Sequence, residues 1–209
     1  MRQKTIKIMK QSIEYKIFER MKKAKRGTAF LITDFISYGN SKSCSKALER
    51  LTKEDKIMRV GRGIYVIPRK SKFFGRVGTL SIDEIVKSIA KRDKARIIPT
   101  GLFALNLLGL STQVPMNAVF LTDGVPRKLM IGETPVVLKK TSPKNLAATG
   151  TITPMVIMAL KSIGKEYVTD SEIEKIVSVL KKENPKHVAN DMKIAPAWIA
   201  EIMRKALTN

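Results

Sequence analysis

Residues 27–68 read GTAFLITDFISYGNSKSCSKALERLTKEDKIMRVGRGIYVIP. The stretch predicts, in order, a short strand, two helices joined by a glycine turn, and a basic β-hairpin that reverses at Gly61-Arg62-Gly63. This order is typical of a winged helix-turn-helix, in which the second helix enters a DNA groove and the hairpin lies against the backbone. We therefore expect a DNA-binding domain at this end of the chain.

The second helix of this unit is expected to begin near Ser41, because Asn40 or Ser41 can accept hydrogen bonds from its free N–H groups. Apolar residues recur at the spacing of one helix face, namely at Cys44, Ala47, Leu48 and Leu51. The opposite face is mostly basic. We predict that this helix contacts DNA through Ser41, Lys42, Ser43, Lys46 and Arg50.

The elements on either side complete the predicted domain. Phe35 and Ile36 are expected to anchor the first helix of the pair, and Gly39 to take a positive φ in the turn that follows. In the hairpin, Arg59 and Arg62 are predicted to reach phosphate or a narrow minor groove. A further helix is expected upstream, over residues 12–23.

The net charge favours a polyanionic partner. The chain carries 40 Lys and Arg against 18 Asp and Glu, for a formal charge of +22, and residues 1–70 hold 19 of the basic and 6 of the acidic residues. Ribosomal RNA, an acidic protein and an acidic membrane surface are the alternatives to DNA. A membrane is the weakest of them, since no apolar run approaches the ~20 residues that span a bilayer. The single cysteine, Cys44, suits a reducing cytoplasm.

The sequence predicts an α+β protein of two domains, with a winged helix-turn-helix over residues 1–70 and a mixed domain over residues 71–209. Residues 69–79 are expected to form a linker from which Phe73 and Phe74 dock on one of the domains. The second domain is predicted to contain helices over 81–94 and 102–108, a strand at 96–98, an antiparallel meander of strands at 118–121, 128–131 and 136–138, and a helical part from about residue 151, with helices over 154–163, 171–182 and 196–207.

No catalytic constellation emerges from the sequence. His187 is the only histidine, which excludes zinc sites built from several histidines, and no glycine-rich nucleotide loop is present. Glu54-Asp55-Lys56 has the Glu-x-Lys spacing of some metal-dependent nucleases, but its place between a helix and a hairpin favours a turn. Asp123-Gly124 is also interpreted as a turn. We expect no enzyme activity, no cofactor and no bound metal.

Two sets of motifs resemble a known family. The first set is FLITDF at 30–35, YGN at 38–40, ALERL at 47–51 and RVGRGIY at 59–65, which is similar to the N-terminal domain of the AbiEi-like antitoxins of type IV toxin-antitoxin systems. The second is PTG at 99–101, ALNLLGLSTQVP at 104–115 and LTDG at 121–124, which resembles the central segment of an uncharacterised subgroup of these proteins. Together the two sets cover about residues 12–140.

The resemblance implies a cytoplasmic antitoxin of an abortive-infection system, which represses its own operon and pairs functionally with a nucleotidyltransferase-like toxin. It also implies that antitoxin activity lies in the C-terminal part. Ser111, Thr112 and Gln113 form a possible functional loop, although a polar loop that closes a buried helix is the simpler interpretation. A stand-alone winged-helix transcription regulator is the first alternative, and an RNA-binding or nuclease-like protein is the second.

Overall fold

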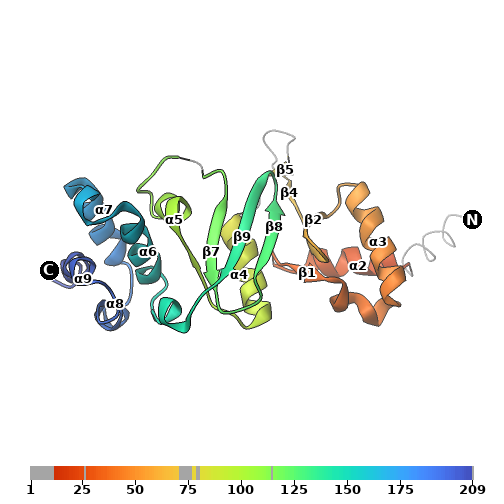
Figure 1. Cartoon of the computed structure of the whole chain (residues 1–209). Coiled ribbons are helices and arrows are strands. Elements are labelled where there is room, and N and C mark those ends of the chain that lie inside the picture. The colour runs from red at the N-terminus through yellow and green to blue at the C-terminus, as the bar shows by residue number, and fades with distance from the viewer. Residues whose placement is uncertain (1–11, 26, 71–76, 79–80, 114, 209) are drawn as a thin grey trace, which may run out of the picture. The chain divides into compact units, whose positions relative to one another are not determined.

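A computed structural model describes residues 12–25, 27–70, 77–78, 81–113 and 115–208, and shows an α+β protein with a helical C-terminal part (Figure 1). Its contacts divide the chain into two compact units. Unit 1 comprises Met1–Arg92 and Leu129–Glu133, and unit 2 comprises Asp93–Lys128 and Thr134–Asn209. The expected α+β class and the helical C-terminal part are therefore confirmed.

Unit 1 contains the elements that the sequence predicts between residues 12 and 68, in the predicted order. They are α2 (Ile13–Lys23), β1 (Phe30–Leu31), the 3₁₀ helix η1 (Ile32–Tyr38), α3 (Ser41–Lys53), β2 (Met58–Gly61) and β3 (Ile64–Val66), followed by α4 (Ile82–Asp93). The three strands form an antiparallel sheet in the order β1-β3-β2. The first predicted helix of the pair is thus a 3₁₀ helix.

The core of unit 1 gathers apolar residues from α2, η1, α3 and the sheet. Phe35 is completely buried and stacks on Phe30, with 5.6 Å between the ring centroids. Ile36, in contrast, is 61% exposed, so the prediction that both residues anchor η1 is wrong for Ile36. A 3₁₀ helix has three residues per turn, which points consecutive side chains in directions about 120° apart. Only one of the two can therefore face the core.

Gly39 joins η1 to α3 in a way that the sequence did not predict. Its φ is 168°, which is extended backbone, so the expectation of a positive φ is wrong. A Cβ at this position would lie 2.6 Å from Cδ1 of Ile13. Glycine is needed here because α2 approaches the backbone closely, and the turn itself demands no special conformation.

The predicted linker is partly a β-ribbon. Strand β4 (Arg69–Lys70) pairs antiparallel with β5 (Val77–Gly78), whereas Phe73 and Phe74 lie outside the described residues. Unit 1 also extends through α4 to Arg92, well past the predicted boundary at residue 70. The contacts that attach α4 join residues almost 60 positions apart, which local sequence patterns do not reveal.

Unit 2 contains strands of a four-stranded sheet whose order is β6-β7-β9-β8. Unit 2 holds β6 (Ile97–Pro99), α5 (Gly101–Leu107), β7 (Ala118–Thr122) and β9 (Thr134–Lys140). The fourth strand, β8 (Arg127–Ile131), is divided, since its residues from Leu129 on are assigned to unit 1. Because β7 pairs with β9 in parallel, the predicted antiparallel meander is wrong. Strand β8, with exposed Lys128 and Met130, takes the edge, where charge is tolerated, and the more apolar β9 lies inside.

The C-terminal part of unit 2 is helical, as predicted, and its helices appear at the blue end of the chain in Figure 1. After η2 (Pro143–Leu146) come α6 (Thr153–Ile163), η3 (Lys165–Tyr167), α7 (Asp170–Leu180), α8 (Pro185–Met192) and α9 (Ala197–Arg204). The sequence predicts no helix between residues 182 and 196, because Asn184-Pro185 is typical of the end of a helix, and the structure shows that this prediction misses α8. Asn184 instead caps α8, its side chain accepting a hydrogen bond from Lys186 N at 3.0 Å, and proline occupies the first turn.

These helices enclose a second apolar core, to which α5 contributes Ala104 and Leu105 and to which Leu108, directly after α5, also belongs. Trp198 of α9, the single tryptophan of the chain, packs against this core. Within the described ranges, no helix is both long and apolar enough to cross a membrane.

Candidate functional site

Helix α3 is held in a single orientation by its cap and its buried face. Asn40 Oδ1 accepts a hydrogen bond from Ser43 N at 2.8 Å, so the helix begins at Ser41 as predicted. Cys44 Sγ lies 3.2 Å from the carbonyl oxygen of Phe35. The four predicted core residues, Cys44, Ala47, Leu48 and Leu51, are all buried. The opposite face of α3 therefore points to solvent.

That solvent face is positively charged. Lys42 and Lys46 are exposed, and neither side chain forms an ion pair within the described part of the chain. Glu49 lies on the same face and pairs with Lys53 at 3.0 Å. The hydrogen bond from Lys53 lowers the pKa of Glu49, and the charges of Lys46 and Arg50 lower it further. This carboxylate stays ionised, yet it neutralises only part of the surrounding charge.

The remaining predicted contacts of α3 are less available. Arg50 is exposed, but its guanidinium lies 4.0 Å from the carboxylate of Glu14 on α2. Ser43 is half-buried and its amide is used by the cap, while Ser41 is exposed at the first position of the helix. Lys42 and Lys46 are therefore the side chains of α3 best placed to meet a ligand.

The β2–β3 hairpin carries the other two predicted residues. Arg62 is exposed in the turn, where Gly63 has a φ of +70°. Arg59 is also exposed, but its Nε donates to the carbonyl oxygen of Gly61 at 3.2 Å, across the bulge in β2. The Arg62 side chain is thus exposed in the turn, whereas the Arg59 guanidinium is hydrogen-bonded to the backbone of its own strand.

The segment between α3 and the hairpin is the expected turn. Asp55 adopts a left-handed φ of +52°, and Lys56 forms an ion pair with Glu54 at 2.5 Å. The Glu54 carboxylate of the Glu-x-Lys pattern is therefore already paired with a cation, the ammonium group of Lys56. In the part of the chain that the structure describes, no group of three or more His, Cys, Asp or Glu side chains is arranged to hold a metal.

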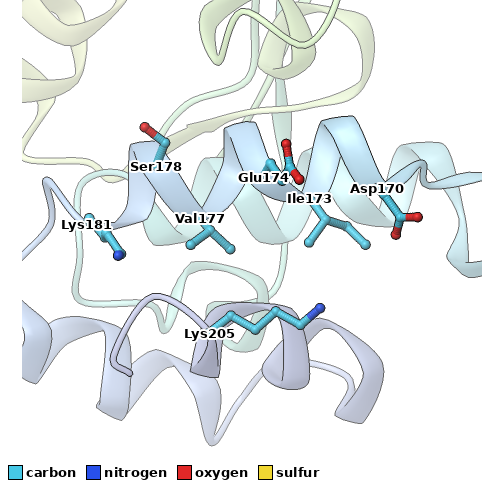
Figure 2. A pocket seen from close by; sticks show the side chains of 7 residues that line it. All are labelled: Asp170, Ile173, Glu174, Val177, Ser178, Lys181 and Lys205. Atoms are coloured by element: carbon cyan, nitrogen blue, oxygen red, sulfur yellow. The ribbon is translucent and has the colours of Figure 1, made fainter. Parts of the chain in front are cut away.

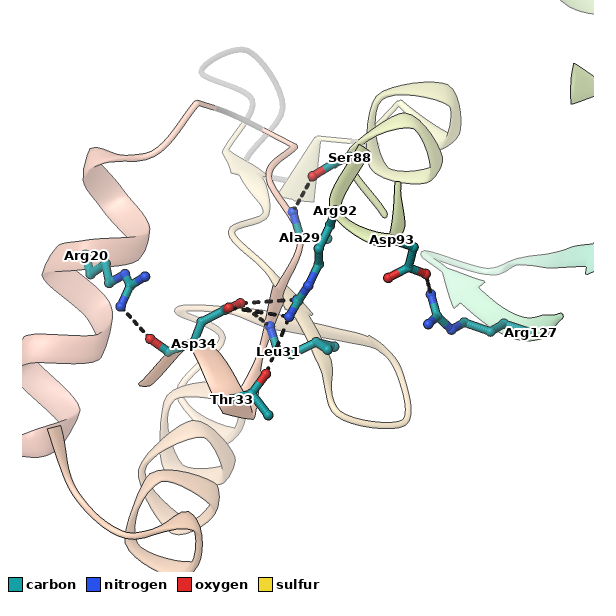
Figure 3. Close-up of polar contacts among 9 residues, drawn as sticks. All are labelled: Arg20, Ala29, Leu31, Thr33, Asp34, Ser88, Arg92, Asp93 and Arg127. Atoms are coloured by element: carbon teal, nitrogen blue, oxygen red, sulfur yellow. Dashed lines mark hydrogen bonds and ion pairs between the residues drawn. The ribbon is translucent and has the colours of Figure 1, made fainter. Parts of the chain in front are cut away.

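A polar network that the sequence analysis missed attaches α4 to β1 and η1 (Figure 3). Asp34 accepts hydrogen bonds from Leu31 N at 2.7 Å and from Arg92 Nη1 at 3.2 Å, and its backbone oxygen accepts from Arg20. Ala29 N donates to Ser88 Oγ at 2.9 Å. The amides on the open edge of β1 are therefore capped by side chains, and α4 is an integral part of unit 1.

In unit 2 the Ser111–Gln113 loop closes the end of α5. Asn106 Nδ2 donates to the carbonyl oxygens of Ser111 and Gln113, both at 3.3 Å, and Gln113 N donates to Ser111 Oγ at 3.2 Å. These bonds give the loop a structural role. The side chains of Thr112 and Gln113 remain exposed.

Two carboxylates hold the chain at the start of α6. Asp191 is 1% exposed and accepts from Thr149 N at 2.7 Å, from Gly150 N at 2.9 Å, and from the hydroxyls of Thr149 and Thr153. Burial raises the pKa of Asp191, but these hydrogen bonds outweigh burial and leave the pKa below its usual value. We call this group the Asp191 cluster.

Glu183 acts beside the Asp191 cluster in the same manner. It accepts hydrogen bonds from the amides of Thr151 and Ile152, both at 2.6 Å. Burial raises its pKa, and the bonds from Ile152, Asn184 and Thr151 lower it to a net value below the usual one. His187 Nδ1 lies 3.6 Å from Glu183. The histidine thus borders a structural carboxylate.

A hollow of about 620 Å³ lies along α7 (Figure 2). Ile173 and Val177 form its apolar part, and the stem of Lys205 runs beneath them. Asp170 and Glu174 lie toward one end of α7 and Lys181 at the other. Charges of both signs border this hollow, so it has no clear preference for a polyanion.

In this α+β protein, the exposed basic face of α3 and the hairpin that follows it in the chain form a candidate nucleic-acid interface of unit 1. The chain belongs to a family of unknown function, DUF6088, whose model matches residues 4–188. A comparison with curated proteins gave no match.

Proposed function

We propose that the chain is a DNA-binding antitoxin and transcriptional autorepressor of a type IV, AbiE-like toxin-antitoxin operon, with a winged helix-turn-helix in unit 1. The observation that carries the DNA-binding part is the exposed pair Lys42 and Lys46 on α3, followed in the chain by Arg62 in the hairpin turn. Cations without carboxylate partners are free to replace the counterions of phosphate.

Each predicted residue has a role in this proposal. Lys42 and Lys46, with Ser41, Ser43 and Arg50 at their flanks, reach into the major groove. Arg62 contacts the backbone or the adjacent minor groove, and Arg59 supports the hairpin beside it. The proposal places the protein in the cytoplasm, where its operon lies.

The antitoxin part rests on the resemblance of residues 12–140 to AbiEi-like proteins. It assigns a nucleotidyltransferase-like toxin as the functional partner and places neutralisation in the C-terminal part of the chain. A stand-alone regulator would use the same DNA site without a toxin. Co-expression of the protein with a nucleotidyltransferase-like gene from the same operon separates the two, because only an antitoxin restores growth.

The DNA-binding part is tested by fluorescence anisotropy with the purified chain, the duplex upstream of its own gene and a scrambled duplex of equal length. A repressor should prefer the upstream duplex about a thousandfold or more. Equal binding to both duplexes, driven only by salt, would reject the autorepressor and turn attention to an RNA or protein partner.

A single substitution refines the test. Lys46→Ala should cost about 1–3 kcal/mol at one base position of the operator if the ammonium group contacts a guanine edge. An equal loss on every sequence would instead assign Lys46 to the phosphate backbone. Ser45→Ala, on the same helix, is the matched control.

A further inference from the structure

Unit 1 has a second basic surface that shares no residue with α3 or the β2–β3 hairpin. An open groove of about 690 Å³ runs between the end of α2, the segment around β1, and α4. Its floor includes the buried Ala29 and Phe30. Its basic lining residues are Arg20, Lys25, Lys87, Lys91 and Arg92. We call it the α4 groove (Figure 3 shows the polar contacts along it).

The α4 groove is lined by five basic residues and two acidic ones. Asp34 is bound by Arg92 and by Leu31 N, whereas the carboxylate of the exposed Glu84 forms no ion pair within the described residues. The groove therefore presents a net positive charge to solvent.

Within the described residues, two lysines of the α4 groove have no ion-pair partner. Lys25 and Lys91 are exposed, and their ammonium groups form no ion pair or hydrogen bond with any residue in the described ranges. Lys87 is exposed as well but pairs with Asp83 at 2.7 Å. Lys25 and Lys91 come from different segments that border one groove, so a single extended anion can meet both.

The spacing of basic residues along α4 suits a nucleic-acid backbone. Lys87 and Lys91 are one turn apart, which corresponds to a rise of about 6 Å. Successive phosphates of one DNA strand rise about 3.4 Å, so two steps cover roughly the same length. Lys91, whose ammonium group is unpaired within the described residues, and Lys87, which shares its charge with Asp83, therefore lie at an interval that a phosphate chain can match.

From these contacts we infer that the α4 groove is a second DNA-backbone site, through which unit 1 binds phosphates outside the contact of α3 and the hairpin. The inference rests on the proposed DNA-binding function and extends its footprint. It assigns Lys25 and Lys91 as phosphate contacts that add affinity without reading sequence. Arg20 and Arg92 are structural, because they hold Asp34.

The test is a salt titration of binding to an upstream duplex of about 30 base pairs, roughly three helical turns. Three double variants are compared with the unmodified full chain. They are Lys25→Ala with Lys91→Ala in the groove, Lys42→Ala with Lys46→Ala on α3, and Lys161→Ala with Lys182→Ala as a matched loss of two exposed lysines in unit 2. None of the substituted side chains makes a hydrogen bond or ion pair within the described residues, so each variant should fold.

If the inference is right, the groove variant lowers the magnitude of the slope of log K against log salt by about 1.8, since each lost phosphate contact accounts for about 0.9. The unit 2 control should keep the original slope. A groove variant that behaves like this control would overturn the inference and leave the groove to an acidic protein segment.

The α3 variant distinguishes this failure from failure of the proposed function. If the salt slope changes only in the α3 variant, the groove is rejected as a DNA site and the basic face of α3 is retained. If the salt slope changes only in the groove variant, the groove is retained and α3 is rejected as the principal contact. Absence of DNA binding by the unmodified chain rejects both.

Discussion

The basic face of α3 and the Asp191 cluster use charge in opposite ways. On α3, Lys42 and Lys46 are exposed and have no carboxylate partner among the described residues. In the cluster, the Asp191 carboxylate is buried and accepts hydrogen bonds from Thr149, Gly150 and Thr153. A solvated charge costs little to keep and is free to bind a ligand, whereas a buried charge must be fully hydrogen-bonded.

The comparison separates function from stability. Substituting exposed lysines should change binding and leave folding intact, and substituting Asp191 should do the reverse. Trp198 makes the second effect measurable, because the only tryptophan of the chain packs against the helical core of unit 2. Its fluorescence therefore reports the unfolding of that core.

The largest effect is expected for Asp191→Ala. Removing the carboxylate leaves the buried Thr153 hydroxyl and the part-buried donors of Thr149 and Gly150 without their acceptor, at a cost of about 1–3 kcal/mol for a buried donor. We expect the free energy of unfolding, measured by urea and Trp198 fluorescence, to fall by about 3 kcal/mol or more. Asn190→Ala, an exposed neighbour on α8, should have little effect. A loss of DNA affinity in the folded Asp191 variant would contradict the assignment of binding to α3 and of stability to the Asp191 cluster.

The Lys42→Ala and Lys46→Ala double variant should have the next largest effect. If Lys42 and Lys46 reach into the major groove as proposed, affinity for the upstream duplex should fall by about 1–3 kcal/mol for each base edge that is contacted. The urea midpoint followed by Trp198 should stay where it is. Unchanged affinity, or a shifted midpoint, would contradict the division between the two regions.

Acid should weaken the Asp191 cluster selectively. The pKa values of Asp191 and Glu183 are lower in the folded chain than usual, because hydrogen bonds to the carboxylates outweigh burial. Their contribution to stability is complete above the unfolded values of about 3.9 and 4.3, and is lost as the pH falls through the lower folded values. Urea midpoints measured by Trp198 fluorescence should therefore decline below about pH 4.

Asp191→Asn is the control for this pH dependence. It removes one titrating group, so its midpoint, although lower throughout, should decline less steeply in acid than that of the unmodified chain. Parallel curves for the two proteins would show that other carboxyl groups control the acid response.

The smallest effect is expected for Arg62→Ala. A lost phosphate contact should weaken binding to upstream and scrambled duplexes alike and lower the magnitude of the salt slope by about 0.9. Anisotropy titrations at several salt concentrations measure both quantities. A change in preference between the two duplexes would instead show that the hairpin reads sequence.

Local patterns were sufficient for most elements of unit 1. The i, i+3, i+4, i+7 spacing identified the buried face of α3, and Asn40 identified its start, because both depend only on residues within one or two turns. The interpretation of Glu54-Asp55-Lys56 as a turn was correct for the same reason. The exposure of Ile36 was missed because two consecutive residues of one helix were both assigned to the core, although neighbouring side chains of a 3₁₀ helix point about 120° apart.

Contacts distant in sequence explain the other errors. The parallel pairing of β7 with β9 depends on which strand takes the sheet edge, and periodicity within a strand does not encode that choice. Helix α8 had a usable signal, since Asn184 and Pro185 suit the beginning of a helix as well as the end of one. Asp191 carried no such signal, because the segment that it holds lies about 40 residues earlier.

The amino-acid sequence was enough to establish the positive charge, the α+β class, the exposed basic face of α3 and the hairpin that follows it. Charge depends on composition, and helix periodicity depends on near neighbours in the sequence. Neither therefore depends on the contacts that distant segments make. The attachment of α4 through Asp34, the α4 groove and the burial of Asp191 emerged only from the folded chain. Each brings together side chains from distant segments, and their proximity follows from packing of the whole unit.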